Sequence, residues 1–434
     1  MKFIRVCVML CLFGNSLFAQ ELRITLDEAL EQGLEESLRL KQAQIDLDLA
    51  SGSARNLWAQ VFPGISVSGG LAYQNSLSAA GPQDPLRYTA AVDVSLSLTN
   101  SLFLSMKNIS LAYHRELLSY EQARRQLENT ITKTFFQLLA KQSGLSILKE
   151  NLDLAEAQRE KQEIAFRNGL VSELVRLESQ LGAGQAALAL SRARTEFNSE
   201  LGKFLALLGY DQSAGAVLEG ELSVQEFHPD GEALIRDYLQ KRPDIVLQRQ
   251  NIAVLENTRH ISAIERRGPI LNLGAEWSGA YGDSVTNGFP SSFSDGLTGR
   301  LILRIPLDSW LPGSKGDQSI RSAGGELEKA RLELESMERN GMAEIRSYAD
   351  SINDSWESIA IARLRSEIAM RAYELAEEGY RSGTVEFLDL QDTRQDMVNA
   401  RQELLAAELS YQTLVLDLAA LINITWKELH PGER

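Results

Sequence analysis

Two related stretches decide how this sequence folds: "YRSGTVEFLDLQDTR" at residues 380–394 and "FRNGLVSELVRLESQ" at residues 166–180. They align without a gap around a shared glycine. Beyond them the same alignment keeps apolar residues in register, and it pairs Leu190 with Leu404, Phe197 with Tyr411 and Phe204 with Leu418. Because a chance match would not stay in register over that distance, the sequence predicts one structural unit that occurs twice.

The repeat covers nearly the whole chain. Residues 20–210 form the first copy and residues 231–424 the second, joined by a polar, glycine-rich connector at 211–230 and followed by a tail at 425–434. Further matches join segments 37–50 and 62–70 of the first copy to segments 243–256 and 268–276 of the second. Each copy is predicted to contain a helix, two strands, a very long helix and a second helix.

The long helices are predicted from two proline-free runs, residues 102–169 and 316–382. A helix of about 65 residues would be about 100 Å long, a length typical of coiled coils or repeat architectures. The second copy also shows the heptad pattern of a coiled-coil seam. The seam residues are Leu390, Met397, Leu404, Tyr411 and Leu418, together with Ala400, Ala407, Leu414 and Leu421.

Four segments alternate apolar and polar residues as strands do; they are residues 65–74, 88–99, 271–281 and 297–307. Their polar face is rich in serine and glycine and carries the charges Asp93, Glu276, Arg300 and Arg304. One interpretation is a sandwich with a solvated face. The other is a barrel wall whose polar face lines a lumen, with an aromatic girdle formed by Tyr73, Tyr281 and Trp310. Four strands cannot close a barrel alone, so the barrel interpretation requires several chains.

The first 19 residues are predicted to be a secretory signal peptide. Lys2 and Arg5 form a basic start, residues 6–13 form a short apolar run, and Ala19 is a small residue at the expected cleavage site. The apolar run is too short to span a bilayer.

The remaining bulk properties restrict the class of protein further. Both cysteines, Cys7 and Cys11, fall in the signal peptide, so the mature chain is expected to lack disulfides and thiol chemistry. A net charge of −15 argues against nucleic acid as a partner. No apolar run after residue 20 is long enough to predict a membrane-spanning helix. A secreted soluble protein and an outer-membrane β-barrel both fit these properties.

Asp389 and Asp392 are three residues apart and are predicted to share one helix face. Such a pair suits an acid/base dyad, half of a metal site, or one sector of a charged ring. A heptad helix offers no pocket in which two carboxylates face a substrate, and two acids on a helix are usually just solvated. Val175 and Glu178 occupy the matching positions of the first copy. One acidic pair per chain, close to the glycine, favours the ring.

Other catalytic motifs do not emerge. The histidines lack metal-ligand spacing; they are His114, His228, His260 and His430. The "GSKG" at 313–316 lacks the rest of a phosphate-binding loop. The sequence therefore predicts neither an enzyme nor a bound metal or cofactor.

The two glycine stretches, together with "KRPDIVLQ" at 241–248 and "FPGISVSGG" at 62–70, resemble the TolC-like outer membrane efflux protein family. The resemblance implies a mainly helical, internally duplicated chain with a small β part of four strands. Three copies would form a homotrimer with a twelve-stranded barrel in the outer membrane, in contact with lipid, and an α-barrel tunnel in the periplasm. A periplasmic adaptor and an inner-membrane transporter would be its partners, with multidrug or metal efflux favoured over type I protein secretion.

The resemblance also assigns roles to residues near the two glycines, which it places at helical-hairpin tips. It implies that an adaptor docks at the tips and that Asp389 and Asp392 constrict the tunnel entrance. The implied docking residues are Gly169, Leu170, Val171, Ser172, Gly383, Thr384, Val385 and Glu386.

This sequence departs from the family where the closed entrance is normally linked. The acidic position after the first tip is Val175 and the basic position in the second is Val385. Tyr380 is retained, although the position of its polar partner is Leu174. Arg176 or Arg381 is the hypothetical substitute. The alternative to a channel is a soluble periplasmic coiled-coil scaffold with a small β-domain, which would be released without detergent.

Overall fold

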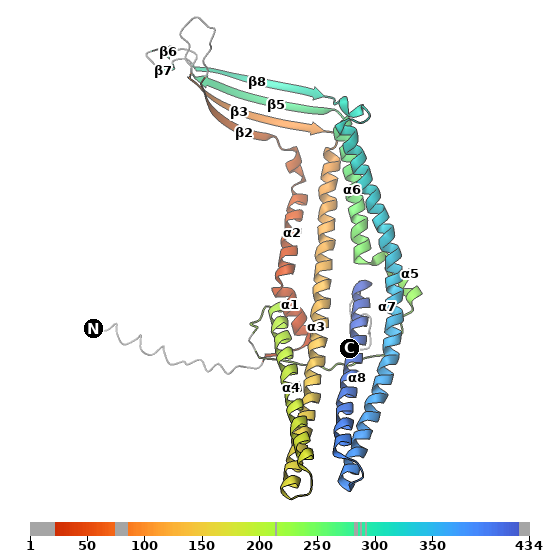
Figure 1. The fold of residues 1–434 in the computed structure, drawn as a ribbon. Coiled ribbons are helices and arrows are strands. Elements are labelled where there is room, and N and C mark those ends of the chain that lie inside the picture. Colours follow the sequence, from red (N-terminus) through yellow and green to blue (C-terminus); the bar gives the residue numbers. More distant parts are fainter. Residues whose placement is uncertain are drawn as a thin grey trace, which may run out of the picture. The chain divides into compact units, whose positions relative to one another are not determined.

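The structure is a computed structural model, and it describes residues 22–73, 86–212, 215–281, 285–286, 289–290 and 293–424. The expected signal peptide at 1–19 and the tail at 425–434 lie outside the described residues. The first half of the chain contains β1 (Leu22–Ile24), α1 (Leu26–Glu36), α2 (Leu38–Arg55), β2 (Gly64–Tyr73), β3 (Leu86–Thr99), α3 (Leu102–Arg167), α4 (Glu173–Leu207) and β4 (Ala216–Leu218) (Figure 1).

The second half repeats the order of two strands followed by two long helices. It contains α5 (Gly231–Tyr238), α6 (Pro243–Arg267), β5 (Ile270–Tyr281), β6 (Val285–Thr286), β7 (Phe289–Pro290), β8 (Phe293–Arg304), α7 (Lys315–Ser382) and α8 (Phe387–Leu421). Short 3₁₀ helices lie at Leu57–Val61, Leu239–Lys241 and Asp308–Trp310. The two proline-free runs therefore form single helices, α3 and α7, with the predicted bounds changed by at most two residues.

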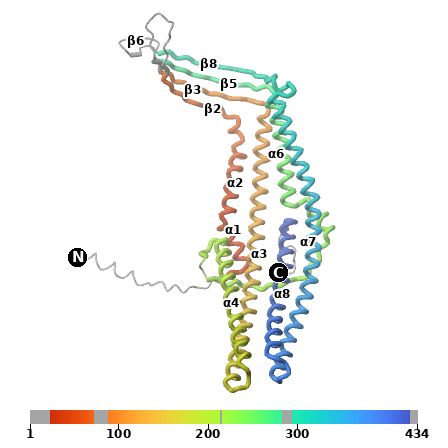
Figure 2. Tube along the Cα trace, in the orientation of Figure 1, coloured from red at the N-terminus to blue at the C-terminus, as the bar shows by residue number. Residues whose placement is uncertain are grey.

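The chain divides into two compact units that cut across the repeats. The hairpin unit consists of Met1–Gln42, Glu121–Pro243 and Asn340–Arg434, and the sheet unit of Ala43–Tyr120 and Asp244–Arg339. Both α3 and α7 contribute residues to each unit. Figure 2 traces the course of these two helices.

The sheet unit holds one antiparallel sheet with the strand order β2-β3-β5-β8. Its register aligns the polar residues of successive strands, since Ser66 pairs with Asp93, Asp93 with Glu276 and Glu276 with Thr298. Because side chains alternate between faces with a period of two, this register puts most polar positions on one face and most apolar positions on the other. The alternation predicted from sequence is therefore continuous across the sheet.

The apolar face of this sheet is exposed in the chain. The exposed residues include Ile65, Val67, Leu71, Leu273, Trp277, Leu297, Leu301 and Leu303. At the loop end of the strands, Tyr88, Tyr281 and Phe293 lie in register as an aromatic row on this face. The predicted girdle residue Tyr281 belongs to this row, and Trp310 lies exposed beyond the opposite end of β8.

The prediction that the strand charges lie on the polar face is wrong for one residue. β8 begins at Phe293 rather than at 297, and this extension brings Asp295 onto the apolar face. The indole Nε1 of Trp277 donates a hydrogen bond to its carboxylate over 3.4 Å. Asp295 lies near the loop end of the strand, where a polar partner and solvent are within reach.

The hairpin unit is a coiled coil formed by α4, α8 and those parts of α3 and α7 that belong to this unit. The predicted seam of α8 is buried at Leu390, Met397, Tyr411 and Leu418 and half-buried at Leu404. α8 is also the one described helix that is long and apolar enough to cross a membrane, and a third of its 18-residue apolar window is buried within the chain. The buried seam, which faces the neighbouring helices, accounts for part of this apolar character.

Hydrogen bonds of one tyrosine and one histidine attach part of the connector to helices of the hairpin unit. The Tyr411 hydroxyl donates to the Gln225 carbonyl over 2.8 Å and accepts from the Phe227 amide over 2.9 Å. His228 lies 3.0 Å from the Asn353 side-chain oxygen and 2.8 Å from the Glu226 carboxylate. These contacts hold residues 225–228 against α7 and α8.

We expect this attachment to depend on pH. The hydrogen bond with Asn353, then that with Glu226, and the charge of Glu357 raise the pKa of His228 above its ordinary value of 6.5. The stabilisation is therefore complete below that value and is lost as the pH rises through the raised pKa. Hydrogen exchange of residues 219–230 should quicken across this window after correction for intrinsic rates. His228→Gln should remove the pH dependence, and an unchanged profile in this variant would contradict the assignment.

Candidate functional site

Both predicted tips are helical hairpins turned by a glycine with positive φ. Gly169 has φ +70° and Gly383 has φ +80°, a conformation that side chains with a Cβ rarely adopt. Each turn closes a helix C-terminus with the hydrogen bonds typical of a glycine cap. The amide of Leu170 donates to the Ala165 carbonyl over 2.9 Å, and the amide of Thr384 donates to the Gly379 carbonyl over 2.9 Å.

The next helix of each hairpin begins differently. Ser172 caps α4, since its side chain accepts a hydrogen bond from the Val175 amide. Glu386 precedes α8 without a side-chain cap bond. Of the predicted docking residues, Val171 and Val385 are half-buried. The others, Gly169, Leu170, Ser172, Gly383, Thr384 and Glu386, are exposed.

The second tip is packed around Gly379. A Cβ on this glycine would lie 2.5 Å from Cγ2 of Val385, a distance that real contacts do not reach. The Thr384 hydroxyl also donates to the Gly379 carbonyl over 3.1 Å. Val385 therefore occupies the family's basic position as a packing residue of its own tip.

Tyr380 has a polar partner that the sequence did not reveal. Its hydroxyl donates to Oε1 of Gln162 on α3 over 3.1 Å, and its ring lies 5.8 Å from that of Phe387. Gln162 is only 3% exposed. The bond joins the two hairpins within one chain. No sequence signal marks Gln162, because its role depends on how α3 faces α7.

The two candidate substitute arginines are paired inside their own hairpins. Arg176 contacts the carboxylates of Glu173 at 3.2 Å and Glu163 at 3.9 Å, and its guanidinium lies 4.9 Å from the centre of the Phe166 ring. Arg381 pairs with Glu377, four residues earlier in α7, at 2.6 Å. Neither arginine joins one hairpin to the other in this arrangement.

Asp389 and Asp392 are exposed on the first turns of α8. Within the described part of the chain neither carboxylate takes part in a hydrogen bond or ion pair. Asp396, which follows Asp392 by four residues, is also exposed and continues the same face. Asp396 was not predicted from the sequence, although its helical spacing from Asp392 is a usable signal. The result is a line of free carboxylates that starts beside the second tip.

Charged residues also lie on the polar face of the sheet unit. Asp93 and Glu276 are directly opposite each other on β3 and β5. Arg300 of β8 forms an ion pair with Glu276, while Arg304 is exposed at the end of the strand. The pair offsets the repulsion between the adjacent carboxylates.

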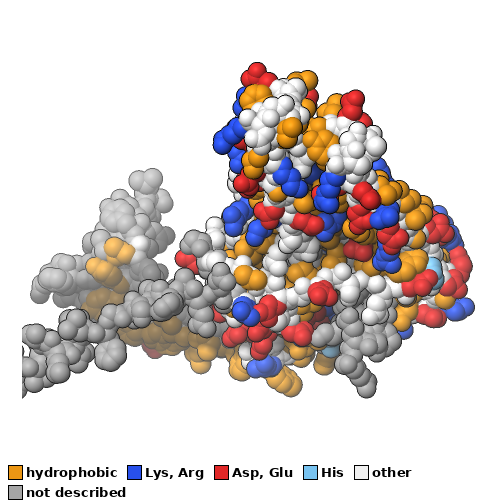
Figure 3. Space-filling view, turned by 90° about the horizontal axis from the view of Figure 1, so that it is seen from below, with side chains coloured by type: hydrophobic (Ala, Val, Ile, Leu, Met, Phe, Trp, Pro, Cys, Tyr) orange, Lys and Arg blue, Asp and Glu red, His pale blue; other side chains and the backbone are white. Residues whose placement is uncertain are grey.

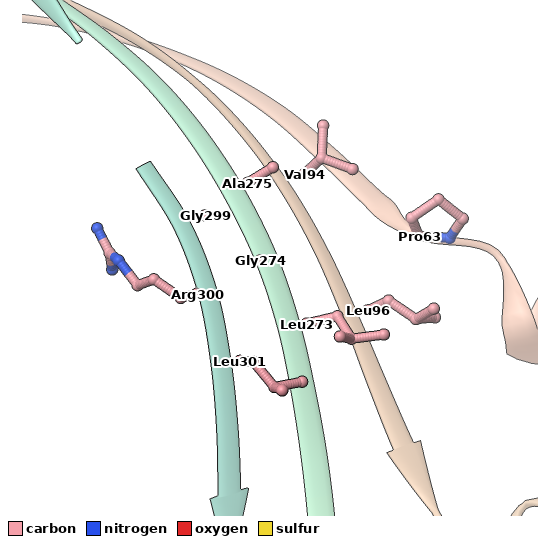
Figure 4. A pocket seen from close by; sticks show the side chains of 9 residues that line it. All are labelled: Pro63, Val94, Leu96, Leu273, Gly274, Ala275, Gly299, Arg300 and Leu301. Atoms are coloured by element: carbon pink, nitrogen blue, oxygen red, sulfur yellow. The ribbon is translucent and has the colours of Figure 1, made fainter. Parts of the chain in front are cut away.

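Figure 4 shows the contrast between the two faces of the sheet. The Arg300 side chain points to one side of the strands, and Leu96, Leu273 and Leu301 point to the other. Those leucines line a shallow hollow of about 480 Å³, open where Gly299 and Ala275 provide little or no side chain. The hollow has no catalytic group and is a feature of the apolar surface.

The surface of the hairpin unit carries both signs of charge. Seen from the tip side in Figure 3, carboxylates and cationic side chains are interspersed with apolar groups. Among the residues that the structure describes, no three His, Cys, Asp or Glu side chains are placed to hold a metal ion.

Comparisons with known proteins agree with this geometry. The family model described as outer membrane efflux protein matches residues 29–209 and 234–423. The chain is 21% identical to the outer membrane protein TolC of Vibrio cholerae, over 92% of this chain and 90% of that protein. It is 23% identical to TolC of Escherichia coli, over 97% and 86% of the two chains.

A solved structure shares the fold. The Campylobacter jejuni CmeC outer membrane channel superposes with a TM-score of 0.75 at 18% identity, covering 92% of this chain and 85% of that one. The two family matches together span most of the described residues. This chain therefore belongs to the outer membrane efflux protein family.

Proposed function

We propose that this chain is the outer-membrane duct of a tripartite export system and that it works as a homotrimer. The four-stranded sheet would lie in the membrane and the helices of both units in the periplasm. The observation that carries the proposal is the sheet, because its apolar face is exposed and both its edges are open. Among the described strands, β2 pairs only with β3 and β8 only with β5.

An open, exposed sheet of this kind favours assembly into a barrel. Unpaired edge strands expose backbone groups that must find partners in a membrane. Since all neighbouring strands are antiparallel, β8 of one copy can pair with β2 of the next in the same pattern. Three copies would close a twelve-stranded barrel with its apolar face toward lipid and the Arg300–Glu276 pair toward the lumen.

The hairpin unit provides a second contact between copies. α4 carries exposed leucines at heptad spacing, and α7 carries a similar exposed stripe; we call these the α4 stripe and the α7 stripe. The α4 stripe consists of Leu174, Leu177, Leu181 and Leu188. The α7 stripe consists of Ile361, Leu364, Ile368 and Leu375. Exposed apolar stripes on coiled-coil helices are normally covered by another helix, and we assign them to each other across the boundary between copies.

The duct itself needs no catalytic residue, because a transporter supplies the energy and an adaptor delivers the substrate. The exposed tips support adaptor docking there, and a crosslinker placed at Ser172 or Thr384 would capture that partner.

We propose drugs or metal ions as substrates in preference to secreted proteins. Within "KRPDIVLQ", buried Arg242 pairs with Glu344 at 2.9 Å and Pro243 begins α6. Sensitivity of a deletion strain to drugs and metals tests the substrate class.

The membrane assignment is tested by placing a charge on either face of one strand. Leu297 is 78% exposed on the apolar face of β8, and its neighbour Thr298 lies on the polar face. Leu297→Lys should reduce folded protein in the outer-membrane fraction, because a lysine facing lipid costs about 2–4 kcal/mol near the midplane. Thr298→Lys is the matched control and should insert normally.

Wild-type protein should require detergent for extraction and should conduct ions in planar bilayers. Release of the wild type by osmotic shock, or equal insertion of the two lysine variants, would overturn the proposal in favour of the soluble scaffold.

A further inference from the structure

The core of the hairpin unit changes character along its length. Away from the tips it is mainly apolar, with the fully buried residues Ile131, Phe135, Leu138, Phe204, Ile345, Ile352 and Val415 beside buried Thr132 and Gln412. Toward the tips small and polar residues are buried beside the apolar Phe387, Leu390, Met397 and Val398; the small and polar ones include Asn151, Ala155, Gln162, Ser179, Ala183 and Arg394. Since stabilisation by burial follows the apolar area removed from water, these small and polar residues contribute less of it than large apolar ones would.

Arg394 is the exceptional member of this polar core. It is 9% exposed and lies where α8 packs against α4 and α7. A Cβ on Gly182 of α4 would lie 3.5 Å from Nη2 of Arg394 and 3.2 Å from Nε2 of Gln391. On α7 Tyr373 is close enough to act electrostatically on the guanidinium, but its hydroxyl supplies no negative charge at neutral pH. The absence of a Cβ at Gly182 is what makes room for this arrangement.

The guanidinium has no carboxylate partner. Within the described residues the side chain of Arg394 takes part in no ion pair and no hydrogen bond, and its Nε atom is buried without a partner. Burial lowers the pKa of the guanidinium, the direction expected for a desolvated charge. Glu377 acts electrostatically on the same Tyr373, but Arg381 already holds its carboxylate at 2.6 Å.

Two other arginines, one on α8 and one on α7, are paired with carboxylates of neighbouring helices. Arg401 of α8 contacts Glu150 of α3 at 2.6 Å, and Arg365 of α7 contacts Glu403 of α8 at 2.6 Å. Both are more exposed than Arg394. A buried charge without a partner destabilises the packing around it, and replacement of such a group by an apolar one is often stabilising. Arg394 therefore opposes the arrangement that its own helix adopts here.

We propose that Arg394 acts as a built-in destabilising charge, which lowers the stability of the packing of α8 against α4 and α7 so that the second hairpin separates readily from the first. On separation the guanidinium reaches water or a carboxylate, while the apolar core further from the tips holds α8 in place. The statement that this separation opens the tunnel entrance rests on the proposed function. The separation itself is a property of the folded chain.

The test compares Arg394→Met with Arg401→Met in full-length protein purified in detergent. Arg394→Met should slow hydrogen exchange in peptides covering residues 173–183 and 387–400 by several-fold, because methionine fills the same space without a charge. Arg401→Met removes a paired charge from the same helix and should quicken exchange. Arg394→Gln, which is smaller and neutral, should also slow exchange. Slower exchange in both variants shows that the effect comes from loss of the charge and not from the way methionine packs.

Unchanged or faster exchange in both Arg394 variants would overturn the proposal and would indicate a partner for the guanidinium in the assembled protein. In bilayers Arg394→Met should lower the fraction of time spent conducting. Exchange is measured whether or not the protein conducts. A wild type that fails to conduct would therefore contradict the proposed function and leave the exchange comparison valid.

Discussion

Charging one stripe of the hairpin unit is expected to break the proposed trimer, and charging the stripe assigned to face it with the opposite sign is expected to restore the assembly. Leu181 of the α4 stripe is 62% exposed and Leu375 of the α7 stripe is 52% exposed. Each lies about two helical turns from the tip end of its helix. α4 runs away from its tip and α7 runs toward its tip, so the two helices are antiparallel and these leucines lie at the same height.

Leu181→Glu or Leu375→Lys alone would place an unpaired charge in an apolar contact between copies. The penalty is on the order of several kcal/mol for each ion, and it occurs at every boundary of the trimer. The double variant pairs the charges and should recover most of the assembly. The oligomeric state in detergent, measured by light scattering or native mass spectrometry, checks all three variants.

Leu388→Glu is the matched control, since Leu388 is 53% exposed on α8 but belongs to neither stripe. It should remain trimeric. Additive losses in the double variant would place Leu181 and Leu375 on separate contacts and refute their pairing. Full assembly of both single variants would show that the stripes are not covered by another copy.

The course of the chain was largely predictable from local signals. Proline-free runs ended by Gly169 and Gly383 defined the long helices, because a glycine with positive φ ends a helix at low cost. The strands were predictable from alternation, which a register must follow when one face is apolar. The start of β8 was missed because Gly296 and Gly299 weaken the alternation near its first residues.

The contacts near the two tips were less predictable, for a physical reason. Gln162 and Arg394 are polar residues in long helices, where the usual expectation is solvent exposure. Their burial arises from how α3, α4, α7 and α8 face one another, and the repeat pattern does not encode these facings. Asp389 and Asp392 could be picked out because they adjoin a recognisable tip. Their role in selecting cations is a prediction. Their exposed positions agree with it, and conductance measurements test it.

Neutralising the acidic pair is expected to remove most of the channel's preference for cations. Asp389 and Asp392 are exposed, unpaired within the described chain and adjacent to the second tip. Three copies would bring their pairs together at the entrance, where a ring of carboxylates concentrates cations and repels anions. Asp389→Asn combined with Asp392→Asn keeps the side-chain shape and removes the charge. The reversal potential across a salt gradient in planar bilayers should shift toward zero, and each single variant should lie in between.

Asp396→Asn is the control. It distinguishes a ring of carboxylates at the constriction from a general effect of negative charge along α8. Asp396 lies on the same face of α8, one turn further from the tip, so its carboxylate should contribute less if the constriction is at the entrance. The preference should also weaken as the salt concentration rises, because exposed charges are screened within about 8 Å at physiological ionic strength. Equal effects of Asp396→Asn and of either single variant would move the selective region away from the tip. An unchanged reversal potential in the double variant would show that ions are selected elsewhere, with the charged polar face of the sheet, where Asp93 and Glu276 are adjacent, as the next region to test.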